Sequence, residues 1–347
     1  MPHLQARGLT KVFGSDPRSV LPLLADGVGK DEILERTGHT VGLQDVDVTV
    51  EAGETFVVMG LSGSGKSTLV RCLNRLIEPT AGSLSLDDTD VLALNPRALR
   101  ELRRHRMGMV FQRFALLPHR SVLDNVGFGL RVQGVPRGER EQRANAWIER
   151  VGLQGYETAL PRELSGGMQQ RVGLARALCT DPEVLLMDEA FSALDPLIRR
   201  EMQDELLRLQ EELSKTIVFI THDLDEALRL GDRVAILKDG LLVQVGTPAE
   251  IVMHPADGYV RAFVEDVDRS RVLKVRHVMR PLEPGEDGLA ADAPTLAAST
   301  ALHEALAHVA GADGWVRVVD GDGRTVGRLD ARSTLDALAR ARANASA

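Results

Sequence analysis

Several protein classes are excluded by what this sequence lacks. Only two cysteines, Cys72 and Cys179, occur in 347 residues, which rules out a disulfide framework or a cysteine-based zinc site. No uncharged apolar run approaches the roughly 18 residues of a membrane span, and the opening Met1–Arg7 has no apolar core, so we expect no signal peptide. Basic residues are outnumbered, 42 against 50 acidic ones, and the formal charge of −8 argues against general coating of nucleic acid.

What is present is typical of a globular α/β protein. The composition, 44% apolar and 27% charged, suits a chain of two or three domains. Short apolar runs at 55–59, 184–187 and 216–220 are typical of buried parallel strands, and helical spacing is evident at 67–76 and 196–213. Strands that alternate with helices predict a mostly parallel sheet with helices on its faces.

The two ends of the chain add smaller features. A strand is predicted at 4–13, then one or two short amphipathic helices within 15–42 that close at Gly38, then a half-exposed strand at 46–50. The stretch 280–288 is rich in proline, glycine and acidic residues, as is typical of a linker or a long loop. Beyond it the pattern predicts a small helix–strand–strand–helix unit, at 302–309, 315–319, 325–329 and 334–341.

The segment between the strand at 55–59 and the helix at 67–76 matches the phosphate-binding pattern G-x-x-x-x-G-K-[ST]. Its glycines let successive backbone N–H groups turn inward around phosphate oxygens, and the positive end of the following helix points at them. Lys66 neutralises phosphate charge, and Ser67 offers a hydroxyl ligand to Mg²⁺. The sequence therefore predicts a nucleoside triphosphate site made by Gly60, Leu61, Ser62, Gly63, Ser64, Gly65, Lys66, Ser67 and Thr68.

The apolar strand at 184–187 ends in two carboxylates, Asp188 and Glu189. Asp188 can hold Mg²⁺ through water, and Glu189 would lie beside the terminal phosphate, where a carboxylate can orient and deprotonate the attacking water. Four apolar residues before Asp-Glu would by themselves indicate a core strand with a solvated end. Paired with the phosphate-binding loop, they predict hydrolysis of the triphosphate.

The most specific segment is Leu164-Ser165-Gly166-Gly167-Met168-Gln169-Gln170-Arg171, in which Ser165 lies 23 positions before Asp188. On these residues the chain resembles the ATP-binding subunits of ABC transporters. The resemblance implies ATP as the nucleotide and a head-to-tail homodimer of ATPase subunits. Ser165, Gly166 and Gly167 would begin a helix whose exposed N–H groups contact the γ-phosphate bound to the other subunit.

The same resemblance implies roles for four further residues. Gln112 would contact Mg²⁺ and the attacking water, Asp195 would cross the dimer interface, and His222 would bond the γ-phosphate as a switch. Phe13 would stack on adenine, although the insertion at 15–42 lengthens its separation from the phosphate loop, and a core aromatic is the alternative. A lone histidine after a strand is more often structural, so the role of His222 depends on the resemblance.

The resemblance also implies a domain plan. Residues 1–268 would form the ABC ATPase domain, a P-loop NTPase core with a mostly parallel sheet and a helical subdomain at about 113–165. Within that subdomain, 114–119 and 122–126 would line a groove that receives a coupling helix of a permease.

Three sequence segments make the resemblance more specific: the insertion at 15–42, the stretch 59–80, and 186–199 with its Glu189-Ala190-Phe191-Ser192. In these segments the chain resembles the ATPase subunits of glycine betaine/proline (quaternary amine) importers. The resemblance implies ATP hydrolysis coupled to uptake of such an osmoprotectant. It also implies peripheral attachment to the cytoplasmic face of the cell membrane through integral membrane permease subunits. A substrate-binding protein would be the more distant partner, and nucleic acid would not be one.

Residues 272–341 resemble one CBS module, a small α+β regulatory unit that usually comes as a tandem pair. There is room here for a single module. Asp330 and Ser333 also depart from the hydroxyl residue and the later Asp that often bind ribose in such modules. We therefore expect a packing or dimerisation role for this module rather than nucleotide sensing.

Two other functions remain open. An importer for another small solute, such as an amino acid, would carry the same ATPase motifs. A soluble ABC ATPase that acts on ribosomes would carry two ATPase domains in one chain. One that acts on chromosomes would have long coiled coils between the phosphate loop and the segment that begins at Leu164. Here one phosphate loop occurs, and only 98 positions separate Ser67 from Ser165. A binding module without hydrolysis is disfavoured by the presence of both Glu189 and His222.

Overall fold

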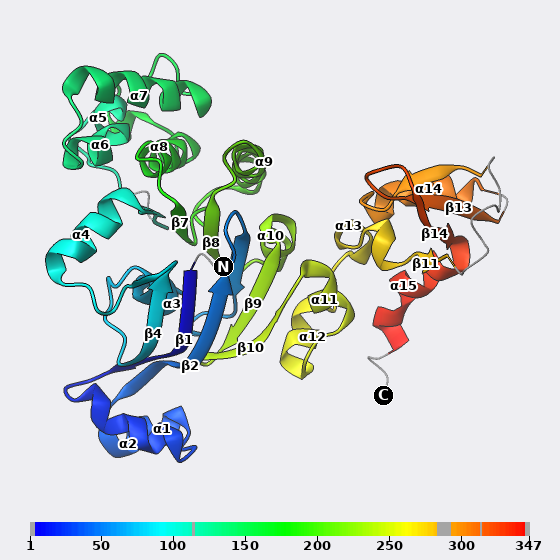
Figure 1. The fold of residues 1–347 in the computed structure, drawn as a ribbon, viewed down its shortest axis with the longest axis horizontal. Helices are drawn as coiled ribbons and strands as arrows, with labels where there is room; N and C mark the ends of the chain where they lie inside the picture. The colour runs from blue at the N-terminus through cyan, green and yellow to red at the C-terminus, as the bar shows by residue number, and fades with distance from the viewer. Residues whose placement is uncertain (1–3, 113–114, 283–292, 313, 344–347) are drawn as a thin grey trace. The chain divides into compact units, whose positions relative to one another are not determined.

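The computed structural model describes residues 4–112, 115–282, 293–312 and 314–343, with the backbone alone at 339–343. The chain divides into two compact units, Met1–Val245 and Gly246–Ala347 (Figure 1). Residues 113 and 114, where the helical subdomain was expected to begin, lie outside the described residues, and so do 283–288 of the expected linker.

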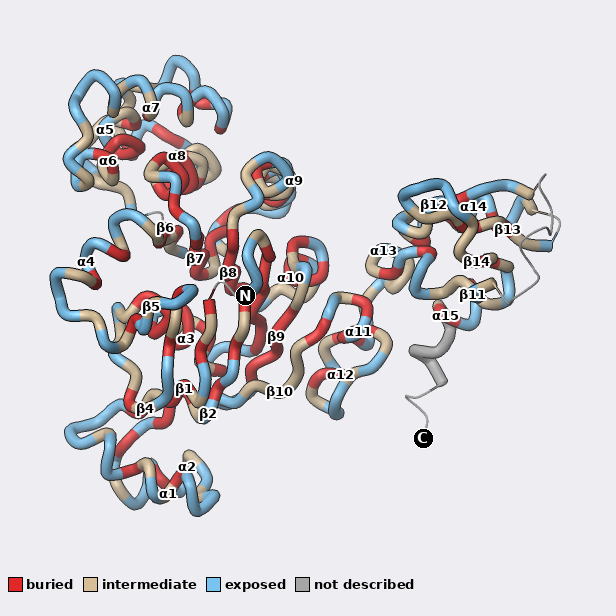
Figure 2. The backbone as a smooth tube through the Cα atoms, in the orientation of Figure 1, coloured by how far each residue is buried: buried red, intermediate tan, exposed pale blue. Residues whose placement is uncertain are grey.

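The first unit is built on a six-stranded sheet in the order β10-β9-β3-β8-β7-β6. From β9 to β6 all neighbouring strands are parallel, and β3, β7 and β8 are buried at every position, as the apolar runs predict (Figure 2). The strands are β3 (Thr55–Met59), β6 (Met107–Val110), β7 (Val184–Asp188), β8 (Thr216–Thr221), β9 (Arg233–Lys238) and β10 (Leu241–Gly246).

A second, antiparallel sheet in the order β2-β1-β4-β5 completes this core. The sequence predicts its first strands but not that they form a sheet of their own. Leu4 and Val46 of this sheet share one hydrophobic cluster with Phe56 and Val218 of the parallel sheet and with Leu69 of a helix. The strands are β1 (Leu4–Phe13), β2 (Thr40–Val50), β4 (Ala81–Leu86) and β5 (Thr89–Asp90), and the helices are α3 (Lys66–Leu73), α4 (Pro96–His105), α9 (Pro196–Leu213) and α10 (Leu224–Leu230).

The insertion at 15–42 folds into short helices, as predicted: η1 (Pro17–Val20), α1 (Leu21–Ala25) and α2 (Lys30–Thr37). Their buried faces share a small core with the adjoining strands, made by Val12, Val20, Leu24, Ile33 and Val41. Gly38 ends α2 with φ +70°, a left-handed conformation that glycine adopts without a Cβ clash.

The helical subdomain has its own core, to which Val122, Val126, Ile148 and Val172 contribute. Val122 and Val126 are fully buried in that core, whereas Leu123 is half-buried and Asp124 is exposed, so of 122–126 only Leu123 and Asp124 stay available for the expected groove. Asn125 is also buried, and its amide bonds the backbone of the preceding loop at Leu117, Arg120 and Ser121. The helices are α5 (Val122–Val126), α6 (Phe128–Val132), α7 (Arg137–Arg150), η2 (Pro161–Glu163) and α8 (Gly166–Leu178).

The second compact unit begins at 246, and Ala249 and Met253 pack in the same hydrophobic cluster as Leu273 and Val275. The bounds 1–268 and 272–341 that the resemblance implies for the two domains stay a prediction. Its four-stranded sheet has the order β11-β14-β13-β12, with β12 and β13 parallel. The elements are α11 (Pro248–Met253), α12 (Gly258–Val264), α13 (Arg269–Val272), η3 (Val275–His277), β11 (Arg280–Pro281), β12 (Thr295–Ala297), α14 (Leu302–Ala310), β13 (Trp315–Val319), β14 (Thr325–Asp330) and α15 (Ala331–Ala343). Across the described parts of both units, none of the helices has the length and apolar character needed to cross a bilayer.

Candidate active site

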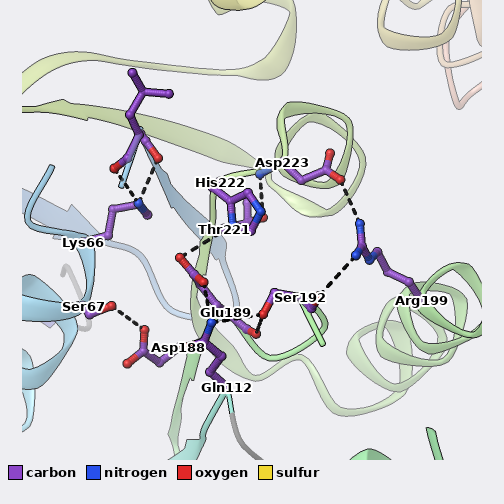
Figure 3. A network of polar contacts seen from close by, with 12 residues as sticks. Lys66, Ser67, Gln112, Asp188, Glu189, Ser192, Arg199, Thr221, His222 and Asp223 are labelled. Atoms are coloured by element: carbon purple, nitrogen blue, oxygen red, sulfur yellow. Dashed lines mark hydrogen bonds and ion pairs between the residues drawn. The ribbon is translucent and has the colours of Figure 1, made fainter. Parts of the chain in front are cut away.

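Four parallel strands deliver the predicted site residues to one edge of the sheet. The register pairs Met59 at the end of β3 with Thr221 at the end of β8, and Val110 of β6 with Met187 of β7. In open α/β sheets the loops that follow the carboxyl ends of the strands make the ligand site. The loops after β3, β6, β7 and β8 therefore meet at this edge (Figure 3).

The phosphate-binding loop after β3 is held in shape by its own lysine. Lys66 Nζ donates hydrogen bonds to the carbonyls of Gly60 and Leu61, at 2.8 and 2.9 Å. Gly60 has φ +153° and Gly65 has φ +101°. A Cβ on Gly60 would lie 2.2 Å from the Leu237 carbonyl oxygen, so only glycine fits there.

The helix that follows the loop offers its N-terminus to an anion. Gly65 precedes α3 and offers no side chain to cap it, whereas Asn95 caps α4 and Asp195 caps α9. The first N–H groups of α3 are therefore available to phosphate oxygens. Burial lowers the pKa of the Lys66 ammonium, while the carboxylates of Glu189 and Asp188 raise it. A bound triphosphate would likewise favour the charged lysine.

Ser67 and Asp188 lie together and could hold a metal ion. Ser67 Oγ donates to Asp188 Oδ1 at 2.8 Å, and Arg71 Nη2 lies 3.4 Å from Asp188 Oδ2. A hydroxyl and a buried carboxylate supply the oxygen ligands that Mg²⁺ prefers, so the donor set fits this ion. The third predicted ligand, Gln112, instead contacts the neighbouring carboxylate of Glu189 (Figure 3).

Glu189 is the residue around which the rest of the site is arranged. Gln112 Nε2 donates to Glu189 Oε2 at 2.9 Å, and His222 Nδ1 lies 3.6 Å from Glu189 Oε1. The backbone of Glu189 has φ +46° and donates its N–H to the Ile220 carbonyl at 3.1 Å. A left-handed conformation in a non-glycine residue costs about 1–3 kcal/mol and tends to be retained at functional sites. Here it accompanies the turn that brings the carboxylate between the glutamine and the histidine.

Phe13 ends β1 with a partly exposed ring, 39% accessible. Lys11 Nζ lies 5.0 Å from the ring centroid, and Gly42 lies against the ring, because a Cβ on Gly42 would come within 2.7 Å of Phe13 Cε2. The Gly42 carbonyl oxygen would in turn lie 2.6 Å from a Cβ on Gly65 of the phosphate loop. Gly42 thus links the aromatic ring to that loop, and stacking of Phe13 on adenine stays a prediction.

The residues expected to act on the other subunit begin two separate helices. Ser165 Oγ accepts from the Met168 N–H at 3.4 Å at the start of α8, and Asp195 Oδ1 accepts from the Ile198 N–H at 3.1 Å at the start of α9. Ser165 and Asp195 are both exposed, as are the backbone groups of Gly166. A group that meets a partner chain must be exposed in this way.

Sequence reasoning missed several residues that the structure connects to the site. Arg71 contacts Asp188, Gly42 lies against Phe13, and Ser192 Oγ lies 3.4 Å from Gln112 Nε2. Arg71 and Ser192 lie within the segments 59–80 and 186–199 that carry the resemblance, but nothing in those segments indicates these contacts, and Gly42 lies at the end of the insertion without a signal of its own.

Comparison with known proteins agrees with this geometry. The family model described as "ABC transporter" matches residues 43–192. The glycine betaine transport ATP-binding protein OpuAA of Bacillus subtilis is 57% identical over 81% of this chain and 67% of its own. The trimethylamine N-oxide transport system ATP-binding protein TmoW of Ruegeria pomeroyi is 51% identical over 98% of both chains.

A solved structure supports the fold independently. A dimeric ATP-binding cassette in a post-hydrolysis state, bound to ADP and phosphate, is 31% identical, with a TM-score of 0.59 over 71% of this chain and 98% of its own. The phosphate loop, the carboxylate pair and these likenesses agree. The chain therefore belongs to the ABC transporter family, as an ATP-binding subunit of the group that includes those of glycine betaine transport systems.

Proposed function

We propose that this chain hydrolyses ATP with Mg²⁺ to power the import of a small, fully alkylated amine through a separate permease. The observation that carries the proposal is the convergence of Lys66, Ser67, Asp188, Glu189 and Gln112 at the carboxyl edge of the parallel sheet. Phosphate-binding groups after β3 and a candidate base after β7, brought to the same edge of one sheet with β8 between them, are what hydrolysis of a triphosphate requires.

Each residue has a distinct task in this mechanism. The first N–H groups of α3 and the Lys66 ammonium hold the β- and γ-phosphates. A magnesium ion bound near Ser67 and Asp188 would neutralise charge that develops on the phosphate oxygens. Glu189 accepts a proton from the attacking water, with its carboxylate oriented by Gln112.

His222 and the helix N-termini of a second subunit complete the site. His222 lies 3.6 Å from the Glu189 carboxylate, where its ring can bond either that group or the γ-phosphate. We infer a head-to-tail homodimer in which Ser165, Gly166 and Gly167 of one subunit contact the γ-phosphate on the other and Asp195 crosses the interface. The dimeric state of the similar ATP-binding cassette supports this arrangement.

The transported solute follows from the relatives. Glycine betaine and trimethylamine N-oxide, named for two of them, share a nitrogen with three methyl groups and a compensating negative oxygen. We therefore infer a permease and a substrate-binding protein that recognise this shared chemistry. The ATPase would sit at the cytoplasmic face of the membrane, attached through the permease.

For the second unit we propose a packing role rather than nucleotide binding. Asp330 Oδ1 accepts from the Ser333 N–H at 2.7 Å and from Ser333 Oγ at 3.0 Å, and these bonds lower the pKa of the Asp330 carboxyl. The carboxylate is thus already engaged at the start of α15, which supports the expectation that this unit lacks a ribose-binding group.

The test is solute uptake by vesicles that contain the chain with its permease and binding protein. Solutes would be glycine betaine, trimethylamine N-oxide, proline and an unmethylated amino acid, each with ATP or a non-hydrolysable analogue inside. We expect ATP-dependent uptake of a methylated solute, abolished by Lys66→Ala because phosphate charge is left unpaired. Uptake of the unmethylated amino acid alone would favour an importer for another small solute, which the sequence left open, and ATP-independent uptake would refute the proposal.

A further inference from the structure

The first turn of α9 joins segments that serve different parts of the site. Asp195, expected to meet the other subunit, caps this turn. Four residues later, Arg199 Nη1 lies 3.3 Å from Asp223 Oδ2, and Arg199 Nη2 donates to the carbonyls of Ser192 and Leu194, at 3.3 and 3.2 Å (Figure 3). One guanidinium thus bonds two backbone carbonyls of the segment that leads into Asp195 and the carboxylate of Asp223, which begins another helix.

The Asp223 end of this contact fixes the turn that carries His222. Asp223 Oδ1 accepts from the Glu226 N–H at 3.2 Å and caps α10, while the Asp223 N–H donates to Thr221 Oγ1 at 3.0 Å. His222 lies between these two bonded residues. The ion pair with Arg199 therefore ties the His222 turn to α9.

Helix α8, which begins with Gly166 and Gly167, contacts the same turn of α9. A Cβ on Gly167 would lie 2.5 Å from Ile198 Cγ2, so α8 and α9 approach there without room for a side chain. Ile198 is also the residue whose N–H bonds Asp195. Ile198 therefore contacts both segments expected to act across the dimer, at Gly167 and at Asp195. The next residue, Arg199, connects them with the turn that carries His222.

The chemistry of arginine suits this junction. Its planar guanidinium presents donors in several fixed directions, so one side chain can bond a carboxylate and two carbonyls together. The Nε of Arg199 is buried and has no hydrogen-bond partner among the residues that the structure describes. An unpaired buried donor is costly, so the side chain is held at this position by the contacts of Nη1 and Nη2.

We propose that Arg199 is a positioning residue that couples the two ATP sites of the dimer. It makes the Asp195 segment and the His222 turn one rigid unit, so that contact of Asp195 with the partner subunit sets His222 against the γ-phosphate. This inference rests on the proposed function, because it requires ATP hydrolysis at a dimer interface.

The test compares variants in the full chain assembled with its permease. We expect Arg199→Ala to lower kcat for ATP about 10- to 100-fold, because small misplacements of catalytic groups have effects of that size. The KM for ATP should stay within about twofold, since the phosphate loop is untouched. Arg199→Lys should restore part of kcat, because an ammonium can pair with Asp223 but lacks the planar fork. The neighbouring Arg200→Ala, an exposed position on the same helix, is the matched control and should retain wild-type rates.

A double-mutant cycle separates coupling from simple loss of structure. If Arg199 acts through the Asp195 segment, Asp195→Ala combined with Arg199→Ala should be no slower than the slower single variant. Where Arg199→Ala does not fold, Asp223→Asn gives the same test, because asparagine keeps the helix cap and removes the charge.

The outcomes are distinct. Equal kcat for Arg199→Ala and Arg200→Ala, a rise in KM without a fall in kcat, or multiplicative effects in the cycle would each overturn the coupling role. Wild-type protein that does not hydrolyse ATP would overturn the proposed function itself, and this inference with it.

Discussion

Replacing the carboxylate of Glu189 with an amide tests the centre of the site with little change of shape. Glu189→Gln keeps one oxygen, which can still accept the hydrogen bond that Gln112 Nε2 donates at 2.9 Å. The new amide group would face His222 Nδ1, now 3.6 Å away, which can accept a hydrogen bond when the ring is neutral. The change therefore removes a proton acceptor and a negative charge while the contacts on both sides can remain.

The expected loss is that of a general base. Positioned general bases contribute about 10²- to 10⁴-fold to rate, or about 2.7 to 5.4 kcal/mol at 1.36 kcal/mol per tenfold. Nucleotide affinity should not fall, because Lys66 and the start of α3 are unchanged. It should instead rise slightly, since a carboxylate no longer faces the γ-phosphate. ATP should consequently trap a closed dimer.

The assay has two parts. Phosphate release measures kcat, and size-exclusion chromatography with ATP and Mg²⁺ measures dimer formation. The matched control is Glu201→Gln, which makes the same change at an exposed position of α9, where the carboxylate lies 3.8 Å from Arg171 Nη2. It should leave both readouts at wild-type values.

One result would refute the reasoning directly. Turnover by Glu189→Gln within about threefold of wild type is too small a loss for a general base. The attacking water would then be activated by another group. Loss of ATP binding would show instead that the amide disturbs the nucleotide cradle.

Three further predictions concern other parts of the chain. Gly42→Ala should raise the KM for ATP several-fold with little change in kcat, because its Cβ would displace the Phe13 ring, and an unchanged KM would contradict adenine stacking. Burial raises the pKa of Glu226 above its ordinary value of 4.5, so the folded chain binds a proton that the unfolded chain has lost. The free energy of unfolding therefore falls as pH rises from the unfolded pKa through the folded one. The stability advantage of wild type over Glu226→Gln, from urea unfolding, should therefore shrink as pH rises, and a constant difference would refute the shift. A chain that ends at 246 should have a higher melting temperature than one that ends at 268. The longer chain exposes the apolar face of α11, which in the full chain packs in the core of the second unit. Equal melting temperatures would contradict a boundary at 246.

Much of the nucleotide site could be predicted because its determinants are local. A phosphate loop needs glycines and a lysine at fixed offsets between a strand and a helix, and the buried strands at 55–59, 184–187 and 216–220 are short apolar runs. The insertion helices and their stop at Gly38 follow from apolar spacing and a left-handed cap in the same way.

The burial of Val122 and Val126 could not be predicted in this way. Val122 and Val126 recur at helical spacing, which a sequence shows equally for a face turned to a partner and for a face turned to the chain's own core. Only the packing of α7 and α8 around them decided that they are buried.

By itself the sequence determined the family, the phosphate-binding loop and the identity of the strands that carry it. Tertiary structure alone decided which distant side chains meet: Gln112 with Glu189, 77 positions apart, and Arg199 with Asp223, 24 apart. It also decided that β1 and β2 form a sheet separate from the parallel one, and that the second unit starts at 246. The physical reason is that local conformation depends on neighbours along the chain, whereas these pairings depend on how strands and helices stack, and one sequence carries no direct record of that.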